Sequence, residues 1–499
     1  MALTPSITFE AFARAARTGN VIPISAAIAA DTVTPVSAFM KLTGEATHAF
    51  LLESVEGGEK LARFSFLGCQ PRRHMSYRRP LLEIFQDGER TSRKQDIFSY
   101  LQNELLQFRP GASDDLPRFA GGWVGYFGYD TVRDIERLPE RSPAAAAGDP
   151  ALPPDAAFSL YDTILAFDHL RQQIRLLTNV FIDESELNLK RRYEDAVAKL
   201  ADLAARLRRP ASTEESHENL PPAEPVYHQT REQFVAAVQR VQEHIAAGDV
   251  FQAVLSQRFH CPVQASPFQI YRALRLINPS PYLYFLKHGE VCLIGSSPEM
   301  MVRVENGLAQ VRPIAGTRRR GAHPAEDEAL ERELQADAKE RAEHLMLVDL
   351  GRNDLGRVCE YGSVQVDTLM ATERYSHVMH LVSSVKGKLQ EGKNALAALR
   401  ACFPAGTVSG APKIRAMEII DELEPEKRGP YAGAVGYLDF SGNLDTCITI
   451  RTIWTQGNIA YFQAGAGIVA DSDPLKEYQE TIEKARVMWS AIDLAERGL

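Results

Sequence analysis

The C-terminal third of the chain contains several short apolar runs, some of them separated by residues typical of tight turns. Three of these runs, 433–440, 446–455 and 459–464, have the length and the β-branched and aromatic content of strands. Ser441-Gly-Asn443, between the first two runs, has the composition of a hairpin turn. Because strands joined by so short a connection must run antiparallel, this region predicts an antiparallel sheet rather than a doubly wound parallel one.

The same kind of reasoning places further elements upstream and downstream. Thr230 and Gln233 have the spacing of a capping box at the start of a helix. More strands are expected at 250–259, 282–287 and 291–295, and helices at roughly 325–347, 395–402, 411–423 and 474–496. This mixture predicts the α+β class, with large, mainly antiparallel sheets and flanking helices.

Two segments interrupt the pattern of strands and helices. Residues 141–154 are rich in alanine and proline and are expected to form a surface loop. Residues 209–225 are polar and proline-rich and follow a helical run, as an interdomain linker would. We therefore expect an N-terminal domain at 1–210, a linker at 211–227 and a C-terminal domain at 228–497.

Composition and charge narrow the class of protein. The 499 residues are 45% hydrophobic and 24% charged, which is ordinary for a globular protein. A formal net charge of −9 disfavours binding to nucleic acid or to an anionic membrane. The six cysteines are scattered without a Cys-x-x-Cys pair, and no apolar run reaches 18 residues. We expect a cytoplasmic protein with reduced thiols that binds neither nucleic acid nor membrane.

Two pairs of glutamates have the spacing that places both carboxylates on one helix face. Glu340 and Glu343 form the first pair, and Glu477 and Glu480 form the second in a helix that Asp473 is expected to cap. Four such carboxylates could serve a hard ion such as Mg²⁺, which prefers oxygen ligands. Taken alone, each pair is more typical of an ordinary solvated helix face than of a metal site.

Two glycine-rich segments and one arginine could hold small anions. Gly406-Thr-Val-Ser-Gly410 precedes Pro412, which suits the first turn of a helix, and a helix N-terminus attracts a carboxylate. Gly465-Ala-Gly467 would let the backbone approach a ligand closely. Arg451 falls within the strand predicted at 446–455 and could form a bidentate contact with a carboxylate. Without other information, these are also ordinary turns and an ordinary ion-pairing arginine.

Together with Pro313-Ile-Ala-Gly-Thr317, these motifs resemble the chorismate-utilising enzymes. The likeness covers nearly the whole chain and is densest from 278 to 485. Within the family, the sequence is most similar to the synthase components that make anthranilate. The resemblance implies a two-lobed version of the α+β fold expected above.

The resemblance also implies roles for individual residues. It assigns Mg²⁺ binding to Glu340, Glu343, Glu477 and Glu480. It places His380 and Thr407 in the active site as catalytic residues. The implied mechanism also needs an acid that protonates the leaving hydroxyl, and we expect Glu340 to be that acid. The resemblance assigns chorismate binding to Gly316, Thr317, Thr407, Tyr431, Arg451, Gly465, Ala466 and Gly467. His377 has no counterpart in the family and is expected to be structural.

One position bears on the choice of reaction. Relatives that make aminodeoxychorismate or isochorismate typically carry lysine where this chain has Ala315. The resemblance therefore implies Mg²⁺-dependent amination of chorismate with ammonia and elimination of pyruvate to give anthranilate, the first committed step of tryptophan biosynthesis. The alternatives are a synthase component that makes aminodeoxychorismate or aminodeoxyisochorismate, and a non-catalytic sensor that binds tryptophan.

Partners and regulation follow from the same comparison. None of the six cysteines stands in the Gly-x-Cys-x-Gly turn of a related glutamine amidotransferase, so ammonia is expected from a separate component II. The family likeness implies a heterotetramer of two large and two small subunits. It also implies feedback inhibition by L-tryptophan, in a pocket formed by Glu53, Ser54, Pro281, Tyr282 and Leu283.

Overall fold

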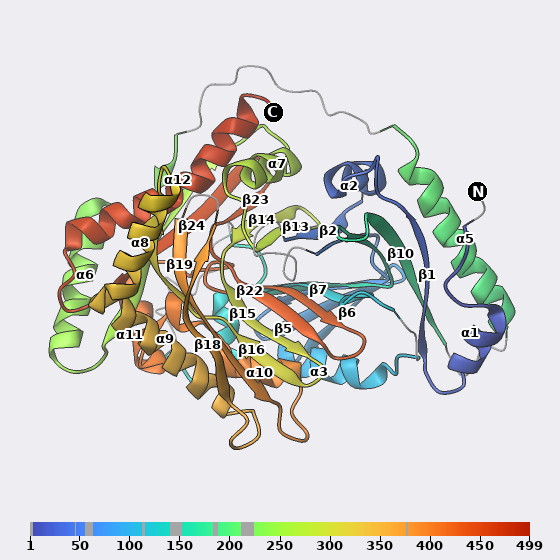
Figure 1. The fold of residues 1–499 in the computed structure, drawn as a ribbon, viewed down its shortest axis with the longest axis horizontal. Helices are drawn as coiled ribbons and strands as arrows, with labels where there is room; N and C mark the ends of the chain where they lie inside the picture. Colours follow the sequence, from blue (N-terminus) through green and yellow to red (C-terminus); the bar gives the residue numbers. More distant parts are fainter. Residues whose placement is uncertain are drawn as a thin grey trace.

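Two large antiparallel sheets make up the body of the molecule (Figure 1). The structure is a computed structural model that describes residues 3–44, 46–54, 63–111, 115–139, 152–182, 188–210, 224–375 and 378–499. Within these ranges, each sheet has 12 strands. The α+β class and the mainly antiparallel pairing predicted from the sequence are confirmed.

The first sheet contains strands from both halves of the chain. In spatial order these are β1 (Val21–Ala29), β10 (Gln173–Phe181), β9 (Thr163–Asp168), β3 (Phe64–Cys69), β2 (His48–Glu53), β13 (Tyr282–His288), β14 (Val291–Ser297), β23 (Thr452–Gln456), β24 (Ile459–Ile468), β12 (Gln252–Pro262) and β11 (Val226–Tyr227), with β20 (Gly410–Ala411) beside β12. The two halves of the chain meet where β2 pairs with β13, with Glu53 opposite Leu283.

The second sheet is mixed in the same way. Its order is β17 (Ile314–Arg319), β19 (Val378–Lys388), β16 (Leu308–Val311), β15 (Met300–Glu305), β22 (Leu444–Ile448), β21 (Ala434–Asp439), β7 (Gly122–Phe127), β8 (Ala156–Tyr161), β4 (Arg73–Arg78), β5 (Leu81–Gln86) and β6 (Glu89–Lys94), with β18 (Gln365–Arg374) beside β19. Here the halves meet where β7 pairs with β21. Each of the two segments expected to be domains therefore contributes strands to both sheets.

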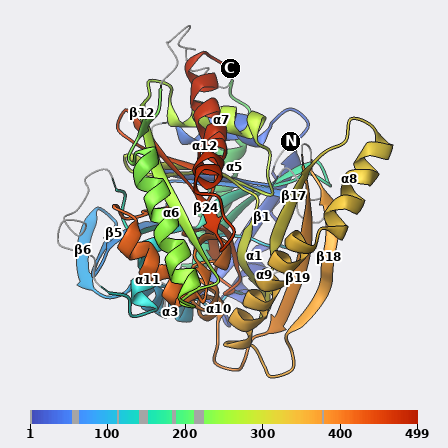
Figure 2. The ribbon, with the colours of Figure 1, turned by 90° about the vertical axis from the view of Figure 1, so that its left-hand side faces the viewer.

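Helices cover the outer faces of the sheets (Figures 1 and 2). They are α1 (Phe9–Ala15), α2 (Pro35–Thr43), α3 (Ile97–Gln107), η1 (Tyr129–Asp134), α5 (Leu189–Leu207), α6 (Arg231–Ala246), α7 (Pro267–Ile277), α8 (Pro324–Ala336), α9 (Ala338–Gly356), α10 (Ala395–Cys402), η2 (Gly406–Val408), α11 (Lys413–Leu423) and α12 (Pro474–Glu496). Within the described residues, no helix is long and apolar enough to cross a membrane.

The inner faces of the two sheets pack through an aromatic core. Phe50 and Phe66 of the first sheet lie in one buried cluster with Tyr126 and Tyr437 of the second. Phe66 and Tyr437 lie edge to face, with ring centroids 6.1 Å apart. Full burial of one such side chain stabilises the fold by about 1.5–3 kcal/mol. This apolar layer therefore holds the two sheets together.

Two expected elements are corrected by the structure. The single helix expected at 325–347 is two helices, because Asp337 ends α8 and caps α9 by accepting from the backbone of Lys339 and Glu340. The single strand expected at 446–455 is also wrong. β22 ends at Ile448 in one sheet, and β23 begins at Thr452 in the other. The chain thus crosses between the sheets at a point that periodicity alone did not reveal.

Other expectations agree closely with the structure. Thr230 and Gln233 form the predicted capping box at the start of α6. Asp473 caps α12, and the helix expected at 474–496 has those bounds. The helix expected at 411–423 begins two residues later, at Lys413, because Gly410–Ala411 pairs with β12. The expected surface loop lies outside the described residues from 141 to 151, as do 211–223 of the expected linker and His377.

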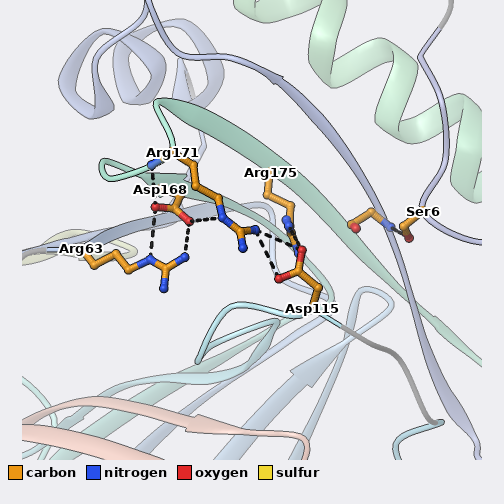
Figure 3. A network of polar contacts seen from close by, with 7 residues as sticks. Ser6, Arg63, Asp115, Asp168, Arg171 and Arg175 are labelled. Atoms are coloured by element: carbon orange, nitrogen blue, oxygen red, sulfur yellow. Dashed lines mark hydrogen bonds and ion pairs between the residues drawn. The ribbon is translucent and has the colours of Figure 1, made fainter. Parts of the chain in front are cut away.

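An arginine–aspartate network fixes the start of β3 (Figure 3). Asp168 accepts hydrogen bonds from Nε and Nη2 of Arg63 at 3.2 and 2.7 Å, and Asp115 accepts from Arg171 and Arg175. Burial alone would raise the pKa of Asp168, but the bonds from Arg63 and the Arg171 backbone lower it overall. The Arg63 guanidinium also lies 4.7 Å from the centre of the Phe64 ring.

The shared sheets make a prediction about fragments of the chain. Residues 224–499 produced alone should aggregate, because removal of β2 and β7 uncovers the edges of β13 and β21 together with their apolar faces. Production together with residues 1–210 as a second chain should restore a soluble complex. Size-exclusion chromatography and near-ultraviolet circular dichroism measure both outcomes. A monomeric 224–499 fragment with native-like aromatic signals would contradict the prediction.

Candidate active site

A cavity of about 870 Å³ brings together most of the residues predicted to be functional. It is lined by parts of β17, α9, β19, η2, β24 and α12, and Figure 2 shows α12 and β24 on this side of the molecule. The predicted site residues among its lining are Thr317, Glu343, His380, Thr407, Tyr431, Arg451, Gly465, Gly467, Glu477 and Glu480. Ala315, the position that bears on the choice of reaction, also lines it.

Three predicted site residues do not line the cavity. The side chain of Ala466 is fully buried in an apolar cluster behind β24, because alternate residues of a strand face opposite sides. Gly316 has a positive φ of 70° and contributes its carbonyl oxygen to His380. Glu340 forms an ion pair with Arg318 at 3.2 Å. The helix N-terminus expected to hold an anion is also absent from the lining, which includes Thr407 and Val408 of η2 but no residue of α11.

The two glycines of β24 allow close packing beside the cavity. A Cβ added to Gly465 would lie 2.6 Å from the Tyr431 hydroxyl and 2.7 Å from the Leu255 carbonyl oxygen. A Cβ on Gly467 would lie 2.5 Å from Nε2 of Gln252. Distances this short exclude any larger residue without movement of the neighbours. The glycines therefore let Tyr431 and Gln252 lie directly against the strand.

Arg451 reaches the cavity because the chain changes sheets at this point. Its φ of 50° is a left-handed conformation that is costly for a residue with a side chain. Burial lowers the pKa of its guanidinium, although Tyr431 acts in the opposite direction. Within the described residues, no carboxylate lies within ion-pair distance of this side chain. The geometry thus presents a buried cation whose charge is available to an anionic ligand.

Three further carboxylates line the cavity, those of Glu343, Glu477 and Glu480. Burial raises the pKa of Glu343, and the neighbouring charges of Glu340 and Glu480 raise it further. Burial also raises the pKa of Glu477, with a further contribution from Glu480. Such carboxylates are suitable ligands for a cation that neutralises their charge.

The carboxylates do not yet form a closed metal site. Within the described part of the chain, no three His, Cys, Asp or Glu side chains are arranged so that they could hold one ion together. Lys484 instead pairs with Glu480 at 2.5 Å and donates to the Gly465 carbonyl at 3.0 Å. A bound ion would therefore require the glutamates to turn toward a common point. Lys484 was not singled out from the sequence, although its i,i+4 spacing from Glu480 would have indicated the pair.

The hydrogen bonds of His380 define its tautomer. Its Nδ1 lies 2.9 Å from the carbonyl oxygen of Gly316 and 3.1 Å from Oγ1 of Thr317. Because a carbonyl oxygen can only accept, Nδ1 carries the proton and Nε2 has a free lone pair. Burial lowers the pKa of this imidazole, so it is neutral near pH 7. His380 is thus prepared to accept a proton through Nε2.

Glu299 is a functional candidate that sequence reasoning missed. Its carboxyl group lines the cavity and is buried, and burial raises its pKa to about 8. Thr407 Oγ1 lies 3.1 Å from both carboxyl oxygens. A carboxylic acid that stays protonated at pH 7 inside a cavity is suited to general acid catalysis. A single glutamate in Ser-Pro-Glu-Met has no periodic or paired signal from which this could have been predicted.

A second, much smaller cavity brings together the residues predicted to form a regulatory pocket. Its volume is about 40 Å³, and Glu53, Ser54, Pro281, Tyr282 and Leu283 all line it. Glu53 accepts hydrogen bonds from Tyr271 at 2.5 Å and from Arg275 at 3.0 Å. Within the described residues, the buried Ser54 hydroxyl has no hydrogen-bond partner. The pocket therefore contains one polar group that a ligand could satisfy.

Sequence comparison identifies the class of protein to which this fold and cavity belong. The sequence model of the chorismate binding enzymes matches residues 48–490. The chain therefore belongs to this family and is an enzyme of it, as its motifs predicted. The predicted resemblance to this family is thus confirmed.

Several relatives that match over nearly the full length of the chain share one name. The chain is 47% identical to anthranilate synthase component 1 of Acetivibrio thermocellus over 486 residues, which cover 95% of this chain and 96% of the relative. It is 48% identical to that of Pseudomonas aeruginosa over 497 residues, with 98% and 99% covered. The crystal structure of anthranilate synthase component I from Streptococcus pneumoniae TIGR4 matches with a TM-score of 0.75 and 40% identity, and covers 93% of this chain and 99% of that one.

Proposed function

We propose that this chain is the synthase component of an anthranilate synthase, which aminates chorismate with ammonia and eliminates pyruvate to give anthranilate. One observation carries the proposal: a single cavity contains a protonated carboxylic acid, a neutral histidine of defined tautomer and a buried cation. The identity of 47% with anthranilate synthase component 1 over nearly the full length supports the same reaction.

The substrate is a dicarboxylate, and the cavity offers cations and hydrogen-bond donors to hold it. Arg451 is the first binding group, because its guanidinium is buried in the lining and free of a carboxylate partner among the described residues. Tyr431 is the second: burial raises its pKa to about 12, so its hydroxyl stays a donor. Thr317, Gly465 and Gly467 complete the lining in our assignment. Gly316 acts through His380, and Ala466 contributes only its backbone.

In the first step, ammonia forms a bond to ring carbon 2 while the double bonds shift and the bond between carbon 4 and its hydroxyl breaks. The hydroxyl needs a proton to leave as water. We assign this proton to Glu299 in place of Glu340, because Glu299 is buried in the lining whereas Glu340 pairs with Arg318 outside it. Thr407 orients the Glu299 carboxyl group through its hydroxyl. Ala315 leaves space beside the ring where a longer side chain would obstruct ammonia.

In the second step, the proton on carbon 2 is removed, a double bond forms to carbon 3 and the bond to the enolpyruvyl oxygen breaks. The released enolpyruvate takes up a proton to become pyruvate, and the ring becomes aromatic. Nε2 of His380 is our candidate for the group that accepts the carbon 2 proton. Aromatisation makes this step strongly favourable, so the residues mainly have to position the reacting groups.

We assign Mg²⁺ binding to the acidic side of the cavity. The oxygen-only donors Glu343, Glu477 and Glu480 line the cavity and suit this ion, and Glu340 lies on the same helix as Glu343. The raised pKa values of Glu343 and Glu477 mark negative charge that a cation would neutralise. When bound, Mg²⁺ would supply a positive charge for a substrate carboxylate. Lys484 would have to exchange its contact with Glu480 for one with the substrate.

The supply of ammonia and the assembly are part of the same proposal. The relatives are named component 1, and this chain lacks the cysteine turn of an amidotransferase. We therefore propose a separate glutamine amidotransferase as component II, in a heterotetramer of two large and two small subunits. A cytoplasmic location in tryptophan biosynthesis fits this role.

The direct test of the function uses the purified chain with chorismate, MgCl₂ and excess ammonium. Anthranilate fluorescence and pyruvate should rise together, and EDTA should stop both. Glutamine in place of ammonium should give no turnover by this chain alone. Chorismate loss without pyruvate would instead indicate an aminodeoxy product, and an inactive chain that still binds L-tryptophan would indicate a sensor.

The assignment of Glu299 predicts a specific variant and pH dependence. Glu299→Gln should lower kcat by about 10²–10⁴-fold, because an amide cannot give up the proton. In the wild type, kcat/KM calculated on free ammonia should fall as pH rises through about 8, since the acid is then deprotonated. Glu340→Gln is the matched control and should retain the alkaline fall. An alkaline limb that persists in Glu299→Gln with high activity would show that another group is the acid.

The second cavity predicts feedback inhibition by L-tryptophan. Ser54→Phe should keep the turnover of chorismate but abolish inhibition, because the larger side chain fills a cavity of about 40 Å³. Ser92→Phe on the exposed face of β6 serves as the control and should keep both activity and inhibition. Inhibition is measured from initial rates at increasing tryptophan concentration for the wild type and both variants. Unchanged sensitivity in Ser54→Phe would place the inhibitor elsewhere.

A further inference from the structure

Arg428 is a fully buried arginine directly beneath the cavity, and it does not line it. Its side chain has 0% exposure. Nε and Nη2 donate to the two carboxyl oxygens of Glu424 at 2.9 and 2.7 Å, so the pair is bidentate. Nη1 donates to the Val408 carbonyl at 2.7 Å, and Nη2 donates to the Val254 carbonyl at 2.7 Å. One guanidinium thus joins three separate segments of the chain.

Two of these segments line the cavity, and the Tyr431 ring near Arg428 lines it as well. Val408 lines the cavity and directly follows Thr407, whose hydroxyl contacts Glu299. Val254 belongs to β12 and also lines the cavity. The guanidinium of Arg428 lies 5.6 Å from the centre of the Tyr431 ring. A displacement of Arg428 would therefore affect three residues of the lining, Val408, Val254 and Tyr431.

Glu424 extends the same network to β24. Its Oε1 accepts from the backbone N–H of Ser256 at 2.9 Å and from the Ser256 hydroxyl at 2.7 Å. The Ser256 hydroxyl in turn accepts from Nε2 of Gln463 at 2.8 Å, and Gln463 lines the cavity. The ion pair is thus connected to the strand that carries Gly465.

We propose that Arg428, held by Glu424, is a positioning residue that sets Tyr431 and the Thr407–Val408 turn for chorismate. The proposal rests on the function proposed above. A buried ion pair by itself contributes little to stability, because desolvation offsets the attraction, so the arrangement is better explained by the alignment it gives. The planar fork of arginine satisfies two carbonyls and one carboxylate at once, which a lysine ammonium cannot do.

The contact with Tyr431 adds an electrostatic contribution. A cation near an aromatic ring is attracted to its face and withdraws electron density from it. Burial raises the pKa of Tyr431, and the charge of Arg428 opposes that rise. The Tyr431 hydroxyl is thereby a stronger hydrogen-bond donor toward a carboxylate than an isolated buried phenol would be. Arg428 lies closer to a second ring, that of Tyr129 at 4.7 Å, which does not line the cavity.

Arg428→Lys is the main test. The KM for chorismate should rise about tenfold to a hundredfold, as expected for lost hydrogen bonds to a charged group, with a smaller effect on kcat at saturation. The midpoint of thermal unfolding serves as the measure of folding. A purely structural role predicts a lower midpoint, with KM and kcat unchanged for the folded fraction, and that result would overturn the proposal.

A double-mutant cycle separates positioning from packing. Tyr431→Phe should lose most of its effect on KM when Arg428→Lys is already present, because both changes remove the same interaction. Tyr129→Phe is the matched control: it changes the other ring near Arg428 and should leave KM unchanged in either background. Equal coupling of Arg428→Lys to both tyrosines, or none to Tyr431→Phe, would overturn the proposal. If Arg428→Lys does not fold, Glu424→Gln replaces it in the same cycle with the same criteria.

The wild-type assay keeps this inference distinct from the proposed function. An inactive wild-type chain with chorismate and ammonium contradicts the proposed function. An active wild type, together with an unchanged KM in a folded Arg428→Lys variant, contradicts only the role of Arg428.

Discussion

The passage of the chain between the two sheets at residues 449–451 determines most of what the molecule can do. β22 ends in the second sheet at Ile448, and β23 begins in the first sheet at Thr452. Where the chain crosses between the sheets, Arg451 has a left-handed backbone conformation, and its side chain lines the large cavity. The cost of that conformation, about 1–3 kcal/mol, is sustained by the strands on either side. A cation is thus fixed where a flexible loop would have left it mobile.

Burial determines the charge of the ionisable groups that line the cavity. Glu299 is desolvated enough to keep its proton near pH 7, while the desolvated Arg451 retains its charge and lacks a carboxylate partner among the described residues. Burial raises the pKa values of Glu343 on α9 and Glu477 on α12, and the neighbouring charge of Glu480 adds to both rises, so these carboxylates favour a cation. Such an arrangement places an acid, an anion-binding group and a cation-binding group around one substrate without letting them neutralise each other.

The sequence predicted the elements of this protein better than their connections. Periodicity and capping residues located α6, α10 and α12, and the hairpin between β21 and β22 predicted antiparallel pairing. The sequence could not reveal that β2 lies between β3 and β13, because β2 and β13 are more than 200 residues apart and such a pairing leaves no local sequence pattern. For the same reason the sequence predicts one strand at 446–455, since the apolar pattern continues across the change of sheet.

The same contrast between local and long-range features applies to the candidate site. Residues in recognisable motifs, such as Thr407, Arg451 and Gly465, were predicted and do line one cavity. Glu299 and Arg428 were missed, because their chemistry comes from burial, and burial depends on elements far away in the sequence. Asp337 is similar: its role as the cap that turns α9 toward the cavity follows from the break after α8, which the continuous polar pattern concealed.

The two cavities are connected by the strands that line them. Tyr282 of β13 donates to Asp445 of β22 at 3.1 Å across the small cavity. Tyr284, two residues along β13, bonds the hydroxyl of Thr452 at 2.6 Å, next to Arg451. A tryptophan side chain is far larger than 40 Å³, so a ligand of that size in the small cavity has to displace residues of its lining, to which β13 and β22 both contribute. Any such movement acts on the residue beside Arg451, which gives the proposed inhibition a direct physical route to the anion-binding group.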